Sequence, residues 1–137
     1  MSVIKNKRSQ SGVQFIDTAR NIELLLYELS VKFPKRYRPN LVNDIIKLSH
    51  SLVNNLVAAN SIRVTSEREL QYRLDYLMYA NNSLQCLINQ IGIAQELISD
   101  VSDKRWIDIG LLLNEEAKLI SGIRNSDLKY YEKFVPH

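Results

Sequence analysis

The sequence predicts one all-α domain, an up-down-up-down antiparallel four-helix bundle. Apolar residues recur at alternating spacings of three and four in four successive segments, and the 137 residues include only four glycines and three prolines. Four amphipathic helices with short connections are typical of such a bundle. A chain of this length, 45% hydrophobic and 24% charged, needs no disulfide or metal to stabilise its core. We expect a flexible basic segment over residues 1–14, the bundle over 15–126 and a C-terminal tail over 127–137.

The first helix is expected to begin near Phe15 or Asp17 and to end before Pro34, because the residue preceding a proline is pushed out of the α region. A basic loop of residues 35–38 follows. The apolar stripe of this helix consists of Phe15, Ala19, Ile22, Leu26, Leu29 and Phe33.

Pro39 suits the first turn of the second helix, where its missing N–H costs nothing. The core stripe of this helix is formed by Leu41, Ile45, Leu48, Leu52, Leu56 and Ala59. A second stripe beside it comprises Val42, Ile46, Val53 and Val57. A helix in a monomeric bundle needs one apolar face, so the extra width favours a subunit interface. The alternative is a central helix that is buried on two sides within the monomer.

Ser66 and Glu69 form a capping-box pattern that opens the third helix. Gly92 lies within this helix at a cost of about 1 kcal/mol relative to alanine, so a bend or break is possible there. Asn81 falls on the apolar stripe, either as a register-setting polar residue or as a partly wetted one. The stripe is Leu70, Leu74, Leu77, Asn81, Leu84, Leu87 or Ile88, Ile91, Ala94 or Gln95, and Ile98.

Residues 99–103 supply side-chain acceptors suited to capping a fourth helix. Residues 125–127 are expected to end it, and the polar and aromatic tail beyond them is expected to fray or to form a short extra turn. The apolar stripe of this helix consists of Trp106, Ile109, Leu113, Ala117, Ile120 and Ile123.

The sequence offers no combination of residues suited to catalysis, to a metal or to a cofactor. His50 has no acidic residue three or four positions away, and His137 is the last residue. Glu115 and Glu116 point about 100° apart on a helix, so we expect a solvated surface pair. Cys86 is the lone cysteine, and we interpret it as a small filler residue of a helix.

No segment approaches the length of a membrane span, and the N-terminal residues contain no apolar signal core. A single cysteine suits a reducing compartment, so we expect a cytoplasmic protein without a membrane partner.

Charge is distributed unevenly, with eight basic and three acidic residues in positions 1–40, against ten and twelve in the remainder. Basic groups neutralise phosphates, and tyrosine rings stack on unpaired bases. The candidate nucleic-acid contacts are Lys35, Arg36, Arg38, Arg63, Arg68 and Arg73. For residues 35–38 a merely solvated loop is an equal alternative. Tyr72, Tyr76 and Tyr79 share one face of the third helix, and packing against a neighbouring helix or subunit is the favoured interpretation.

The chain resembles a family of small four-helix bundles. The resemblance rests on Phe33-Pro34-Lys35-Arg36-Tyr37-Arg38 and on the second-helix residues Leu41, Ile45, Leu52, Leu56 and Ala59-Asn60. In the third helix it rests on Ala80, Leu84, Leu87, Ile91, Ala94, Glu96, Leu97, Ile98 and Ser99. It continues through Leu112-Leu113-Asn114-Glu115 and Ile120-Ser121-Gly122-Ile123, so that it covers residues 15–125. The family comprises Avd, the accessory protein of diversity-generating retroelements, and the proteins encoded in intervening sequences of 23S rRNA genes.

Residues 55–60 are more similar to the Avd branch, because the intervening-sequence proteins tend to carry an Asn-Ile-Ala-Glu-Gly-like segment there. The resemblance implies a homopentameric barrel that binds a reverse transcriptase and its template RNA, or an RNA/DNA hybrid, and assists mutagenic cDNA synthesis without catalysing it. Avd proteins often have arginines at the positions of Ile88 and Gly92, and this chain lacks both. The alternatives are an intervening-sequence type of bundle and a protein-only adaptor with no nucleic-acid role.

Overall fold

The computed structural model describes residues 13–136, so most of the expected basic N-terminal segment and His137 lie outside the described residues. Four α-helices account for most of this range: α2 (Gln14–Ser30), α3 (Asn43–Ser61), α4 (Glu67–Leu97) and α5 (Asp103–Tyr130). A 3-10 turn, η2 (Lys35–Tyr37), and a π-helical turn, η3 (Arg38–Val42), connect α2 to α3. The described residues contain no strand, which confirms the all-helical fold class.

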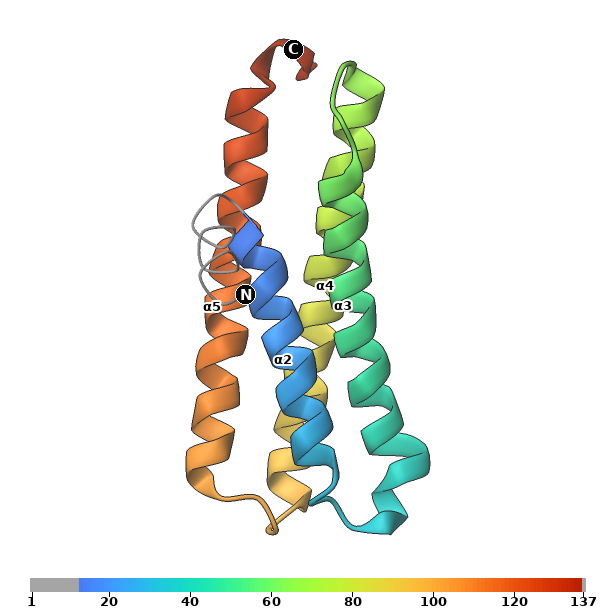
Figure 1. Ribbon diagram of the computed structural model, residues 1–137, viewed down its shortest axis with the longest axis vertical. Helices are drawn as coiled ribbons and strands as arrows, with labels where there is room; N and C mark the ends of the chain where they lie inside the picture. Colours follow the sequence, from blue (N-terminus) through green and yellow to red (C-terminus); the bar gives the residue numbers. More distant parts are fainter. Residues whose placement is uncertain (1–12, 137) are drawn as a thin grey trace, which may run out of the picture.

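The helices alternate in direction, and each packs against two neighbours (Figure 1). Helix α2 lies between α3 and α5, and α4 closes the bundle behind it against the same two helices. The α2–α3 and α4–α5 connections lie at one end of the bundle, and the α3–α4 connection lies at the other end with the C-terminus. Helix α2 has 17 residues against 31 in α4, so α3, α4 and α5 extend beyond its N-terminal end.

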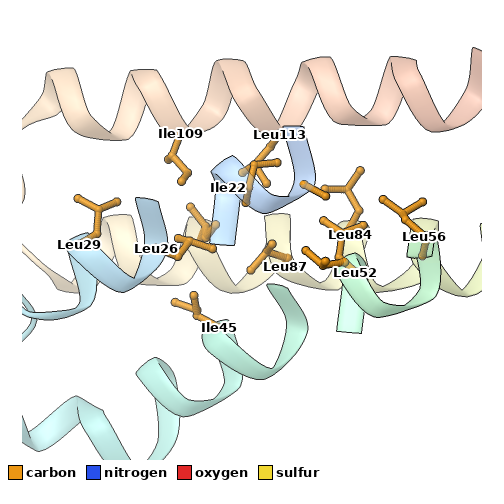
Figure 2. Packing of buried hydrophobic residues seen from close by; sticks show 14 of the residues in the cluster. Ile22, Leu26, Leu29, Ile45, Leu52, Leu56, Leu84, Leu87, Ile109 and Leu113 are labelled. Carbon is orange, nitrogen blue, oxygen red and sulfur yellow. The ribbon is translucent and has the colours of Figure 1, made fainter. Parts of the chain in front are cut away.

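The core is formed by the apolar stripes of all four helices, whose side chains point into a common interior (Figure 2). Near the end that holds the α2–α3 turn, Phe33 and Trp106 close the core, with ring centroids 6.3 Å apart. No helix among residues 13–136 is long and apolar enough to cross a membrane. The buried core residues contributed by α2, α3, α4 and α5 include Ile22, Leu26, Leu29, Ile45, Leu52, Leu56, Leu84, Leu87, Ile109 and Leu113.

The helix starts agree with the capping signals. The hydroxyl of Ser66 accepts a hydrogen bond from the backbone N–H of Glu69 at 3.3 Å, and the Glu69 carboxylate accepts one from the backbone N–H of Thr65 at 2.8 Å. Ser102 caps α5 in the same way, by accepting from the backbone N–H of Arg105 at 3.3 Å. Pro39 occupies the first turn of η3, directly before α3. These side chains satisfy backbone donors that a helix leaves unpaired at its start.

One helix end differs from the expectation, and two alternatives that the sequence left open are decided. Helix α5 does not end at residues 125–127 but continues to Tyr130, and a 3-10 turn, η4 (Glu132–Phe134), follows it. Helix α4 is continuous through Gly92, so no break occurs there. Asn81 is exposed because Ala80 takes its place on the core face of α4, which leaves the amide in water rather than in a register-setting position.

Candidate nucleic-acid and subunit interfaces

The structure divides the six candidate phosphate contacts between the two ends of the bundle. Lys35, Arg36 and Arg38 lie in the α2–α3 turn, whereas Arg63 and Arg68 lie at the α3–α4 connection. Arg38 and Arg63 are separated by the whole of α3, a distance on the order of 38 Å at 1.5 Å per residue. One compact ligand therefore cannot contact both groups on a single copy of the chain.

The basic turn, which we define as Lys35, Arg36 and Arg38, lies on the surface of the bundle. All three side chains are exposed, and none forms a salt bridge with another described residue. The guanidinium of Arg36 lies 4.9 Å from the ring centroid of Tyr37, which is itself half-buried against the core. The 3-10 turn η2 and the first residue of η3 thus hold the basic groups on a short connection that packs against the core through Tyr37.

At the opposite end, Arg68 lies against the exposed Tyr72. Its Nε donates a hydrogen bond to the Tyr72 hydroxyl at 2.6 Å, and its guanidinium carbon lies 5.5 Å from the ring centroid. Arg63 is exposed in the connection between α3 and α4. Both groups are therefore available to a ligand at this end.

Arg73 is not an open phosphate contact. Its Nε lies 2.5 Å from a carboxylate oxygen of Asp127, and its Nη1 donates to the backbone oxygen of Ala59 at 3.1 Å. The side chains of Arg73 and Asp127 are only 12% and 9% exposed. The guanidinium instead ties α4 to α3 and α5, which accounts for the continuation of α5 beyond residue 126.

Three of the four residues in the second stripe of α3 pack within the monomer. His50 lies on this stripe between Ile46 and Val53, and its Nδ1 lies 3.1 Å from a carboxylate oxygen of Glu23 in α2. Val53 is buried, at 7% exposure, and Val42 and Ile46 are half-buried against the core. Only Val57 is exposed, at 40%. This burial favours the alternative of a helix that is covered on two sides within the monomer, and the subunit interface on this stripe stays a prediction.

The three tyrosines of α4 remain on the surface. Tyr72, Tyr76 and Tyr79 are between 37% and 47% exposed, and the rings of Tyr76 and Tyr79 meet edge to face with centroids 6.2 Å apart. Ile88 and Gly92 are also exposed, so the arginines that the resemblance implies there would have reached solvent. Cys86 is exposed on the same helix and is therefore not a packed filler residue.

Glu116 is the clearest departure from the sequence interpretation. It is fully buried rather than solvated, and neither carboxylate oxygen has a hydrogen-bond partner. Burial raises the pKa of Glu116 to about 8, and the charge of Glu115 adds to the effect. By contrast, Glu115 is exposed and accepts a hydrogen bond from Gln14 at 3.4 Å. A fully buried acid without a partner is best accommodated in its neutral form.

An open hollow of about 680 Å³ lies at the C-terminal end between residues 64–65 and residues 129–134. Its charged lining side chains are Lys129, Glu132 and Lys133. Residues 13–136 contain no group of three metal-ligating side chains placed to hold an ion.

A scan against models of known protein families finds no match to the chain, and a search of curated proteins finds no significant similarity.

Proposed function

We propose that this chain is a non-catalytic accessory protein of a diversity-generating retroelement, an Avd-like homo-oligomer that binds a reverse transcriptase and its template RNA. The proposal starts from the resemblance over residues 15–125 and is consistent with four antiparallel helices. The observation that carries it is the basic turn. Three exposed cations without acidic partners among the described residues form a local positive surface, and such a surface attracts the phosphates of RNA.

The basic turn suits a backbone contact rather than base recognition. Lys35, Arg36 and Arg38 present three cations within four residues, and Tyr37 between them is half-buried beneath Arg36. Phosphate contacts position a nucleic acid without selecting its sequence. The proposed RNA contact is therefore tolerant of sequence and sensitive to salt.

A second candidate function is a protein-only adaptor. Two observations favour it. Ile88 and Gly92 are exposed and neutral at positions where the resemblance implies arginines, and Arg73 is held in an internal ion pair instead of being open to a phosphate. An adaptor of this kind would leave the basic turn as an ordinary solvated loop.

Titration of a labelled, structured RNA at several salt concentrations separates the two functions. Contact with phosphates releases counterions, so the logarithm of the affinity falls with the logarithm of salt, by about 0.9 for each phosphate neutralised on a duplex. The triple variant Lys35→Glu, Arg36→Glu and Arg38→Glu should abolish most of this binding while the helical circular dichroism signal stays unchanged. Absence of binding by the natural chain at low salt would refute the RNA contact and favour the adaptor.

A matched control makes the same change in net charge at residues outside the basic turn. The triple variant Lys118→Glu, Arg124→Glu and Lys129→Glu reverses three exposed cations of α5, away from the basic turn. It should retain most of the affinity. Equal losses in the two triple variants would show that net charge alone attracts the RNA and would refute the basic turn as its site. A reverse transcriptase gene and a repeated variable region beside the gene for this chain would support the retroelement assignment.

A further inference from the structure

The outer side of α4 lacks the charges of an ordinary solvent-facing helix. Residues 76–95 contain no Asp, Glu, Lys or Arg, although 24% of the chain is charged. Many side chains of this run are nevertheless exposed, among them Met78, Asn82 and Gln85. Surface helices normally have charged residues opposite their apolar stripe, whereas the centres of protein interfaces are depleted of charge. The run therefore has the composition of a contact surface.

Helix α4 also has a stripe of residues that lies outside the core. We call it the outer stripe, and it consists of Tyr72, Tyr76, Tyr79, Ser83, Cys86, Gln90, Ile93 and Leu97. The spacings alternate strictly between four and three, which is the repeat by which one helix packs along another. None of the eight residues is buried, and its three tyrosines, Ile93 and Leu97 are 37–52% exposed. The hydroxyl of Ser83 lies 2.9 Å from that of Ser51, so the outer stripe runs beside α3.

The outer stripe is complementary to itself in one orientation. Its midpoint falls between Ser83 and Cys86, two small side chains that permit close approach of two helices. In an antiparallel pair about this midpoint, Tyr76 of one helix lies opposite Ile93 of the other, and Tyr72 lies opposite Leu97. Tyr79 lies opposite Gln90, so the half that contains the tyrosines meets the half that contains Gln90, Ile93 and Leu97. A parallel pair would instead place like residues opposite each other and crowd the tyrosines together.

We propose that the outer stripe is a two-fold interface between two copies of this chain, with their α4 helices antiparallel. Between residues 76 and 95 this surface has no cations for a polyanion and no charge with which to select an oppositely charged protein. It does allow two copies with a net charge of +3 each to approach without juxtaposing like charges. The same surface on both copies gives an isologous contact that closes after two chains. The proposal goes beyond RNA binding and applies both to a simple dimer and to two larger rings joined together.

The register can be tested by disulfide formation in a Cys86→Ser background. The double variant Tyr76→Cys and Ile93→Cys should give a covalent dimer on mild oxidation, because each new cysteine faces the other type in the second copy. Either single variant should stay uncross-linked, since identical positions 76 lie about 25 Å apart along the antiparallel helices at 1.5 Å per residue. A disulfide requires Cα atoms within about 7 Å of each other.

The double variant Asn81→Cys with Ile88→Cys is the matched control. These two exposed residues are centred on the same midpoint of α4 as Tyr76 and Ile93, but they lie on the other side of its core stripe. This double variant should remain uncross-linked. Cross-linking of a single variant would indicate a parallel pair, and equal cross-linking of both double variants would indicate random collision. Either result would overturn the proposed interface.

A charge placed at the centre of the outer stripe provides an independent test. Cys86→Glu brings two carboxylates together at the two-fold axis and should halve the mass found by light scattering, with at least a tenfold loss of self-association. Gln85→Glu, an exposed neighbour off the outer stripe, should leave the mass unchanged. An oligomer whose mass survives Cys86→Glu would overturn this interface alone. A monomeric natural chain at tens of micromolar would also remove the homo-oligomer from the proposed function, whereas the RNA titration would still test the basic turn.

Discussion

The buried carboxyl of Glu116 should make the stability of the bundle depend on pH. In the folded chain the pKa of Glu116 is raised from 4.5 to about 8, mainly by burial. Between these values the folded state retains a proton that the unfolded state has lost, so the free energy of unfolding decreases as pH rises. Each pH unit corresponds to about 1.4 kcal/mol, which gives a total loss of roughly 5 kcal/mol between pH 4.5 and pH 8. This loss is large beside the 5–15 kcal/mol that stabilise a typical domain.

The assay is urea denaturation of the natural chain and of Glu116→Gln at several pH values from 4.5 to 9. The amide retains the shape and the unpartnered polar group but does not ionise. The two proteins should therefore be similar in stability at pH 4.5, and Glu116→Gln should be more stable by roughly 5 kcal/mol at pH 9. Glu116→Leu should show the same gain and a further 1–3 kcal/mol at every pH, because it also removes a buried polar group without a hydrogen bond.

Glu115→Gln is the matched control, since this neighbouring carboxylate is exposed. It should change stability by about 0.5 kcal/mol or less, in the range of surface substitutions. The difference between the natural chain and Glu116→Gln must grow with pH for the reasoning to hold. A difference that stays constant from pH 4.5 to pH 9 would show that Glu116 is ionised and solvated in the folded protein.

Three further variants test the other structural assignments by chemical denaturation. Arg73→Leu should destabilise the bundle by about 3–5 kcal/mol because it leaves a buried Asp127 carboxylate unpaired. The double variant Arg73→Leu with Asp127→Leu should recover most of this loss. If Arg73→Leu alone cost less than about 1 kcal/mol, the pair would be solvated. Ser66→Ala should cost about 1 kcal/mol through the lost helix cap, and an unchanged midpoint would show that the cap contributes nothing. Val53→Ala should cost about 2 kcal/mol and Val57→Ala well under 1 kcal/mol, whereas equal costs would contradict the burial difference.

The number, order and starts of the helices could be predicted because they depend on local signals. Apolar spacing marks one face of each helix, and Ser66 and Ser102 supply acceptors to donors only three residues away. Which of two adjacent residues faces the core could not be predicted in the same way. Steps of three and four allow either Ala80 or Asn81, and either Glu116 or Ala117, to face the core. The apolar residue faces inward in the first case, whereas in the second the acid is buried and Ala117 is half-buried.

Long-range contacts account for the other differences. Residues 125–127 resemble a helix end, but Asp127 pairs with Arg73, which is 54 residues away in the chain, and α5 continues past it. The same ion pair removes Arg73 from the candidate phosphate contacts. The basic residues lie at two different ends because the helices alternate in direction. Their spacing along the chain does not show this until the helices are arranged in a bundle. The absence of charge in residues 76–95 was visible in the sequence and is the signal that identifies the outer stripe.

The two proposals together predict that self-association strengthens RNA binding. The basic turn lies at one end of the bundle, whereas Arg63 in the α3–α4 connection and Arg68 in the first turn of α4 lie at the other end. An antiparallel α4 pair would bring the basic turn of one copy to the same end as Arg63 and Arg68 of the other, so each end of the dimer would combine both groups. Cys86→Glu, which changes no basic residue, should then weaken RNA binding and reduce its salt dependence, as should Arg63→Glu with Arg68→Glu. Full RNA affinity in a monomeric Cys86→Glu protein would show that the basic turn acts alone and that the two surfaces are independent.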